Sequence, residues 1–158
     1  MAETIRNVFI SHKHEDDDGL QDLKRLVRGH GMTWRDYSIT ADNPNNAHNE
    51  DYIKWQILAP RIRQAGCLVV YISEITKNSD WVNWEIEYAQ RLGKRIVGVW
   101  ARGDRDCDLP EALEDYWDAL VGWNGENIIA AINGASDESN KQDGTQTDYR
   151  PIERYACR

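Results

Sequence analysis

One stretch of the sequence places residues that could do chemistry at a spacing that brings them together. Residues 79–87 read Ser-Asp-Trp-Val-Asn-Trp-Glu-Ile-Glu, so Trp81 and Glu85 are four apart. Residues four apart share one face of a helix, which puts Glu85 beside an aromatic ring and partly shields it from water. A carboxylate in that place could face a developing positive charge. Because such pairs are routine, the spacing alone favours an ordinary surface acid next to a core-edge Trp.

Other candidate motifs are weaker. The acidic run 15–18 opens a helix, where it complements the helix dipole, and this is favoured over a divalent-metal site because no further carboxylates converge on it. The four histidines lack the ligand spacing of a helix-borne metal site, and no GxGxxG, GxxxxGK[ST], GxSxG or HExxH motif occurs. We therefore expect neither a metal site nor a resident cofactor.

Short apolar runs alternate with segments of helical periodicity along most of the chain. The expected strands are residues 7–11, 33–35, 67–72, 96–100 and 119–121, and the expected helices are residues 20–27, 51–65, 81–92 and 124–132, with a short one after Pro110. The run 67–72 is almost continuously apolar, which is typical of a central parallel strand covered on both faces. This alternation predicts a three-layer α/β fold with a parallel sheet of about five strands and helices on both faces.

Helix ends and breaks are marked by particular residues. Pro60 lies inside the helix 51–65 and should kink or restart it. Ser79 or Asp80 can cap the helix that follows, and Asn124 can cap the last one.

The loops that follow the strands are where ligands bind in a parallel sheet. They are residues 11–19, 36–49, 73–80 and 101–109. The strand 67–72 is followed by Ser73. A response-regulator receiver needs a phosphoacceptor Asp at that place, so that class of protein is disfavoured.

Composition limits the class of protein. The chain has 158 residues, a net charge of −8 and three cysteines without a CxxC pair, and its pI is about 5.0. These values predict one domain, argue against a general nucleic-acid binder, and make a disulfide framework or zinc site unexpected. No apolar run is long enough to span a membrane and no signal peptide is visible, so we expect a cytoplasmic protein with no membrane partner.

Four segments, in order, resemble a TIR domain of the type typified by the NAD-processing subunit of bacterial Thoeris anti-phage systems. Residues 8–12 (Val-Phe-Ile-Ser-His) resemble the first-strand box, and residues 34–39 (Trp-Arg-Asp-Tyr-Ser-Ile) the stretch entering the BB loop. Residues 79–86 match the serine-x-tryptophan-cysteine/valine-x-x-glutamate signature, and residues 93–99 resemble the strand after it. The resemblance implies a flavodoxin-like TIR fold, which we expect over residues 1–133, followed by a polar, flexible tail, residues 134–158.

The resemblance also implies a site. Glu85 would be the catalytic carboxylate and Trp81 part of the pocket wall. The expected substrate-binding residues are Phe9, Ser11, His12 and Lys13 on the floor at the end of the first strand, Asp36 and Tyr37 in the mobile lid, Ser73 and Trp81. The pair His12-Lys13 stands where many NAD-cleaving TIR domains have an aromatic and a basic residue.

The implied reaction is cleavage of the nicotinamide–ribose bond of NAD+, used as substrate, through an oxocarbenium-like transition state. Capture of the cation by water would give ADP-ribose, and capture by an adenine nitrogen or a ribose hydroxyl would give a cyclic isomer. The Thoeris resemblance favours a cyclic signal that activates a separate effector protein. Self-association stays open.

Two other functions remain open. One is a non-enzymatic TIR-like interaction module, which an exposed Trp55 or Trp84 would suit, although core-edge packing explains both side chains more simply. The other is a glycosyl-transferring enzyme acting on nucleosides, against which the Trp81–Glu85 motif argues.

The negative charge is unevenly distributed. Residues 1–103, which hold the four segments, carry 14 acidic and 14 basic residues, whereas residues 104–140 carry ten acidic and one basic. The acidity therefore does not argue against binding of an anionic dinucleotide by the first part.

Overall fold

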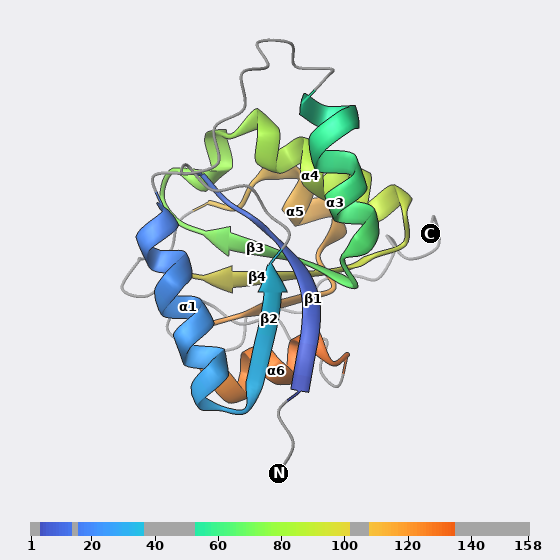
Figure 1. Cartoon of the computed structure of the whole chain (residues 1–158). Helices are drawn as coiled ribbons and strands as arrows, with labels where there is room; N and C mark the ends of the chain where they lie inside the picture. The colour runs from blue at the N-terminus through green and yellow to red at the C-terminus, as the bar shows by residue number, and fades with distance from the viewer. Residues whose placement is uncertain (1–3, 14–15, 37–52, 102–107, 135–158) are drawn as a thin grey trace.

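A five-stranded parallel sheet forms the centre of the computed structural model (Figure 1). Its strands are β1 (Thr4–Ser11), β2 (Met32–Asp36), β3 (Cys67–Ile72), β4 (Arg95–Trp100) and β5 (Ala119–Val121), in the spatial order β2-β1-β3-β4-β5. This is the flavodoxin-like order. The structure describes residues 4–13, 16–36, 53–101 and 108–134. The predicted fold class is confirmed.

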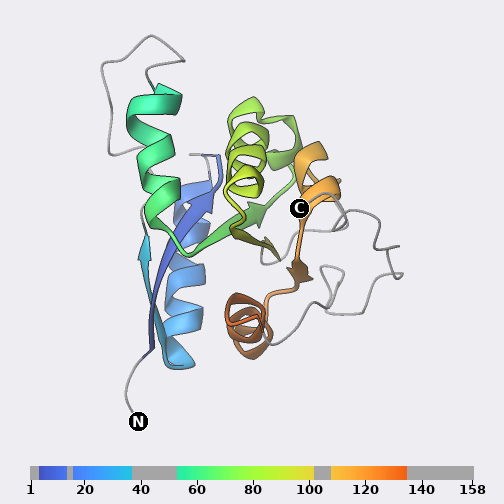
Figure 2. The same ribbon diagram turned by 90° about the vertical axis from the view of Figure 1, so that its right-hand side faces the viewer.

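Helices cover both faces of the sheet, which gives the three predicted layers (Figure 2). One face carries α1 (Asp17–Gly29) and α6 (Gly125–Ile132), and the other carries α3 (Ala59–Gln64), α4 (Asp80–Arg91) and α5 (Glu111–Tyr116). A π-helical segment, η2 (Ile53–Leu58), runs into α3, and a 3-10 turn, η3 (Thr76–Asn78), lies between β3 and α4. No helix in the described part of the chain is both long enough and apolar enough to cross a membrane.

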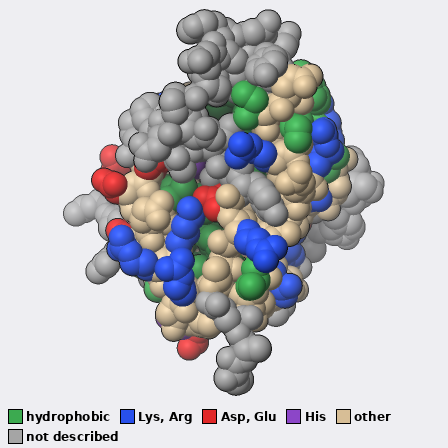
Figure 3. All heavy atoms as spheres, viewed as in Figure 1, with side chains coloured by type: hydrophobic (Ala, Val, Ile, Leu, Met, Phe, Trp, Pro, Cys, Tyr) green, Lys and Arg blue, Asp and Glu red, His purple; other side chains and the backbone are tan. Residues whose placement is uncertain are grey.

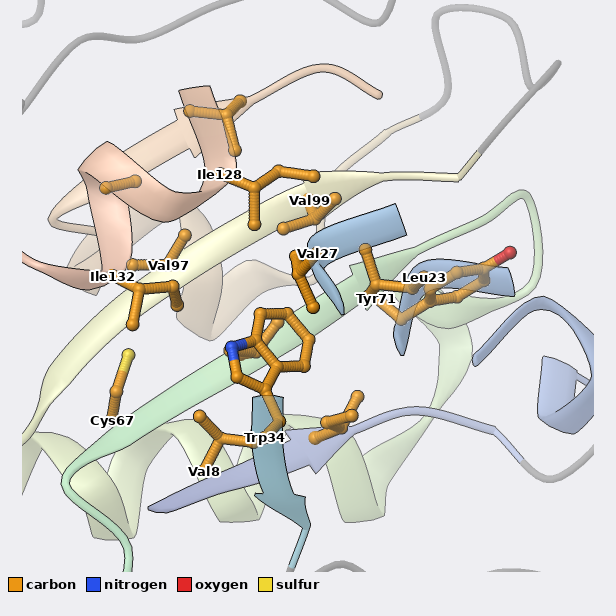
Figure 4. Close-up of a cluster of buried hydrophobic side chains, with 14 of the residues drawn as sticks. Val8, Leu23, Val27, Trp34, Cys67, Tyr71, Val97, Val99, Ile128 and Ile132 are labelled. Carbon is orange, nitrogen blue, oxygen red and sulfur yellow. The ribbon is translucent and has the colours of Figure 1, made fainter. Parts of the chain in front are cut away.

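The core consists of one apolar layer on each side of the sheet. Successive strand residues point to opposite faces, so Val8 and Ile10 of β1 pack against α1 and α6, whereas Phe9 packs against α3 and α4. Figure 4 shows the layer on the α1 and α6 side, with Trp34 of β2 at its centre. All six residues of β3 are buried, as its continuous apolar run predicts.

The helix boundaries follow the predicted signals. Ser79 caps α4 by accepting a hydrogen bond from the Val82 N–H at 3.2 Å, and Asn124 caps α6 in the same way. Pro60 lies in the first turn of α3, directly after the π-helical segment, so the predicted restart of the helix is confirmed.

Strand β1 begins three residues earlier than the predicted strand 7–11. Residues 4–6 are exposed and pair with β2 alone, so they need no apolar pattern to be part of the sheet. The predicted loop 36–49 beyond Asp36, and the predicted tail beyond Gly134, lie outside the described residues.

Candidate active site

Glu85 and Ser11 meet between the carboxyl ends of β1 and β3. Ser11 is the last residue of β1, and its hydroxyl donates a hydrogen bond to Glu85 Oε1 at 2.7 Å. After β1 the chain turns to α1 on one face, and after β3 it turns to α4 on the other. A parallel sheet has its natural ligand-binding crevice at such a point.

The surroundings of Glu85 are apolar and closed to water. Glu85 is 7% exposed and lies on the buried face of α4 with Val82, Ile86 and Ala89. Burial raises the pKa of Glu85 to about 8, and the hydrogen bond from Ser11 acts in the opposite direction. The carboxyl group is therefore mostly neutral at pH 7, and a positive charge brought beside it would favour its ionised form. A buried carboxyl group whose pKa is raised in this way is a candidate functional group.

The loop after β3 is fixed to the start of α1. The Ser73 hydroxyl donates to Asp16 Oδ2 at 2.7 Å, and the Ser73 N–H donates to Thr76 Oγ1 at 2.8 Å. Thr76 in turn donates to the carbonyl of Tyr71 at 3.0 Å. These contacts join the loop after β3 to the segment before α1. Ser73 therefore helps to fix the shape of the site through its hydrogen bond to Asp16.

His12, the residue after Ser11, is held by two acceptors. Its Nδ1 lies 2.9 Å from the Ile10 carbonyl oxygen, and its Nε2 lies 2.8 Å from Asp17 Oδ1. The side chain is 3% exposed. The two contacts fix the orientation of the His12 ring between β1 and the first turn of α1.

Two predicted site residues occupy other places in the structure. Asp36 is the last residue of β2 rather than part of a loop, and its carboxylate pairs with Lys24 Nζ of α1 at 2.7 Å. It lies beside Val8, three residues before Ser11, because β2 extends along β1. Phe9 is 1% exposed inside the core layer below α4, since strand alternation turns it toward the helices, so it supports the site from beneath.

The remaining predicted site residues are Lys13, Trp81 and Tyr37. Lys13 is half-buried just after β1, where its carbonyl accepts from the Asp16 N–H at 2.9 Å. Trp81 is half-buried at the start of α4, with Lys54 Nζ 5.6 Å from its ring centroid. Tyr37 lies outside the described residues.

Asp16 and Thr76 were not predicted to belong to the site. Asp16 looked like one of four helix-opening acids, and only the proximity of β1 and β3 brings it to Ser73. Thr76 has a sequence signal, because the spacing Ser73-x-x-Thr76 in a loop suits a side-chain-to-backbone turn. Among the described residues, no group of three or more His, Cys, Asp and Glu side chains is arranged to hold a metal ion.

A family model described as "Thoeris protein ThsB, TIR-like domain" matches residues 9–106, which is more than half of the chain. The chain belongs to the Thoeris ThsB TIR-like family. The matched region runs from β1 past the end of β4, and so includes both Ser11 and Glu85. No protein with a curated description matches this TIR-like chain.

Three solved structures are distant likenesses of the TIR-like chain. A CMP N-glycosidase from Clostridium botulinum has a TM-score of 0.43 and 13% identity, over 95% of this chain and 94% of that one. A 2-desoxiribosyltransferase from Leishmania mexicana has a TM-score of 0.43 and 15% identity, over 68% and 76%. A conserved protein from Enterococcus faecalis V583 has a TM-score of 0.41 and 12% identity, over 84% and 87%. These similarities are too distant to indicate the chemistry of the site.

Proposed function

We propose that this TIR-like chain cleaves the bond between nicotinamide and ribose in NAD+, with Glu85 as the catalytic carboxylate. The observation that carries the proposal is the buried Glu85, bonded to Ser11 at the point where β1 and β3 send their loops to opposite faces. Membership in the Thoeris TIR-like family supports it.

The proposed chemistry needs one ionised carboxylate. Nicotinamide leaves with the electron pair of its bond to ribose C1′, and because it is already cationic no acid has to protonate it. Positive charge then develops on the ribose, as in glycoside hydrolysis. An ionised Glu85 stabilises that charge, and the Ser11 hydroxyl fixes the carboxylate in place. Before the bond breaks, the positive charge on the nicotinamide ring of bound NAD+ also favours the ionised form of Glu85.

We further propose that the cation is captured within the same molecule, to give a cyclic ADP-ribose isomer. If water is excluded from the site when NAD+ is bound, an adenine nitrogen or a ribose hydroxyl is favoured over water as the nucleophile. The diffusible product would then reach a separate effector protein, in keeping with the Thoeris family.

The test is incubation of the purified chain with NAD+, with products separated by mass. Glu85→Gln keeps the size of the side chain and removes its charge, so we expect nicotinamide release to fall by at least about 100-fold. Glu87→Gln, two residues along the same helix at an exposed position, is the matched control and should keep its activity. Equal turnover by the wild type and the Glu85→Gln chain would sink the proposal.

One observation favours a second candidate function, a non-enzymatic interaction module. Trp55 is 46% exposed, and its ring meets those of Trp84 and Tyr88 edge-on at 5.7 and 5.5 Å. Exposed aromatic clusters are common in interfaces. Absence of any NAD+ turnover, together with an assembly that dissociates on Trp55→Ser substitution, would favour this function over the enzyme.

A further inference from the structure

A pocket of about 660 Å³ opens at the amino edge of the sheet, the end opposite Ser11 and Glu85. The pocket exists because β1 begins before β3 along the sheet. Val8 is the first residue of β1 that pairs with β3, so residues 4–7 extend beyond the start of β3. The turn from α3 into β3 closes one side, where the Gly66 N–H donates to the Asn7 carbonyl at 2.8 Å. The end of α6 closes another side.

The polar lining of this pocket is entirely basic or neutral. Its polar side chains are Arg6, Asn7, Arg35, Gln64, Lys94 and Asn133. Lys and Arg side chains gather on the lower part of the face in Figure 3. A pocket with three cations and no carboxylate in its wall is unusual in a chain whose net charge is −8.

Two of the three cations are held in place by neutral groups. Arg6 donates from Nε and Nη2 to Asn133 Oδ1 at 3.1 and 2.9 Å, and Lys94 Nζ donates to the Arg63 carbonyl at 3.0 Å. Within the described ranges, neither of these two cations nor Arg35 forms an ion pair with a carboxylate. The orientation of Arg6 and Lys94 is therefore fixed, while the charge of all three cations stays available to a ligand.

We propose that this pocket binds a small ligand that carries a phosphate or pyrophosphate group. Two guanidinium groups and an ammonium group, with three side-chain amides between them, match the donors that phosphate oxygens accept from. No aromatic side chain lines the pocket, so the anionic group rather than a stacked base is the part recognised. A hollow of this size suits a small molecule, whereas nucleic acid would meet a strongly acidic protein. The proposal does not depend on NAD+ cleavage.

The test is calorimetric titration of the full chain with pyrophosphate. Arg6→Gln and Arg35→Gln each remove one charge from an exposed position, so the fold should be retained, which circular dichroism checks. We expect each substitution to weaken binding by about tenfold. Arg25→Gln is the matched control, because Arg25 is an exposed arginine of α1 outside the pocket lining, and its affinity should equal that of the wild type.

Two further binding measurements distinguish this pocket from other binding sites. Glu85→Gln should leave pyrophosphate affinity unchanged, whereas a change of affinity in either direction would place the anion at the other end of the sheet and overturn the proposal. A single-stranded oligonucleotide should bind more weakly than pyrophosphate, and the reverse order would overturn the ligand class. Absence of pyrophosphate binding at millimolar concentration, or equal affinity in Arg6→Gln, Arg35→Gln and the wild type, would also refute the site.

Discussion

Glu85 acts as a carboxylate in the proposed reaction, yet its surroundings oppose ionisation. Burial raises its pKa to about 8, while the Ser11 hydrogen bond lowers it. In the free protein the active form is therefore the minor one at pH 7, and it becomes the major one as the pH rises through about 8. In the proposed reaction, the positive charge of the nicotinamide ring of bound NAD+ would act in the same direction as Ser11 and lower the pKa of Glu85.

The first prediction is a pH profile. Because kcat/KM reports ionisation of the free enzyme, it should rise with pH and level off above about 8. The profile of kcat reports the complex with substrate, so it should level off at a lower pH. Initial rates of nicotinamide release between pH 5.5 and pH 9.5 check this. A kcat/KM that falls over this range would show that the neutral acid is the working form.

The second prediction concerns Ser11. The Ser11→Ala substitution removes the hydrogen bond that favours the ionised Glu85, so the rise in kcat/KM should move to higher pH. At pH 7 we expect a loss of about tenfold, since a hydrogen bond to a charged group contributes about 1.5–3 kcal/mol. The shift of the profile separates this effect from simple loss of fold, which would lower activity equally at every pH.

At the scale of elements, the position of α4 depends on close packing of the sheet against the helices. Gly98 of β4 lies between Val70 of β3 and Leu120 of β5 in the ladder. A β-carbon at Gly98 would lie 2.6 Å from Leu120 Cδ2 and 3.0 Å from Ile72 Cδ1. The layer on the α4 and α5 side therefore requires glycine there, for space rather than for backbone freedom.

The third prediction follows from that packing. Gly98→Ala should lower the free energy of unfolding by about 1–2 kcal/mol, because overpacking in a filled core displaces neighbouring side chains. Gly29→Ala is the control, since a β-carbon at Gly29 meets nothing within 4 Å, and it should be neutral or slightly stabilising. Urea denaturation of both variants measures the difference. Equal stability of the Gly98→Ala and Gly29→Ala chains would contradict it.

At the scale of the whole molecule, the two ends of the sheet have different chemistry. The carboxyl edge holds a buried acid with hydroxyl and carboxylate neighbours, and the amino edge holds three cations. The acidic excess of the sequence lies in residues 104–140. Net charge therefore describes neither end of the sheet.

The fourth prediction uses Cys67, which lies in the wall of the basic pocket, to measure how well its thiol is shielded. Cys67 is buried at the start of β3, and burial raises the pKa of its thiol to about 12, although Arg95 acts to lower it. In a chain with Cys107→Ser and Cys157→Ser, Cys67 should react with a thiol reagent about 1,000-fold more slowly than a free thiol. Guanidinium should restore the free rate. Rapid labelling of the native chain would contradict the burial of this thiol.

The sequence by itself determined the elements and their order. Local patterns encode burial and helix ends, so the apolar run of β3, the Ser79 cap and the restart at Pro60 were all predictable. The i,i+4 spacing placed Glu85 on a capped helix, but by itself it favoured an ordinary surface acid, and the burial of Glu85 contradicts that interpretation. The segments that resemble the family then suggested its proposed catalytic role.

Only the tertiary structure decided which distant residues meet. Ser11 and Glu85 are 74 positions apart, and they touch because β1 lies beside β3. Asp36 belongs to a strand and pairs with Lys24, because ladder pairing with β1 extends β2 through a residue whose type gives no strand signal. The basic pocket likewise joins segments that the sheet order brings together. Which strands become neighbours depends on the strand order of the whole sheet, and the residues of a single strand do not encode that order.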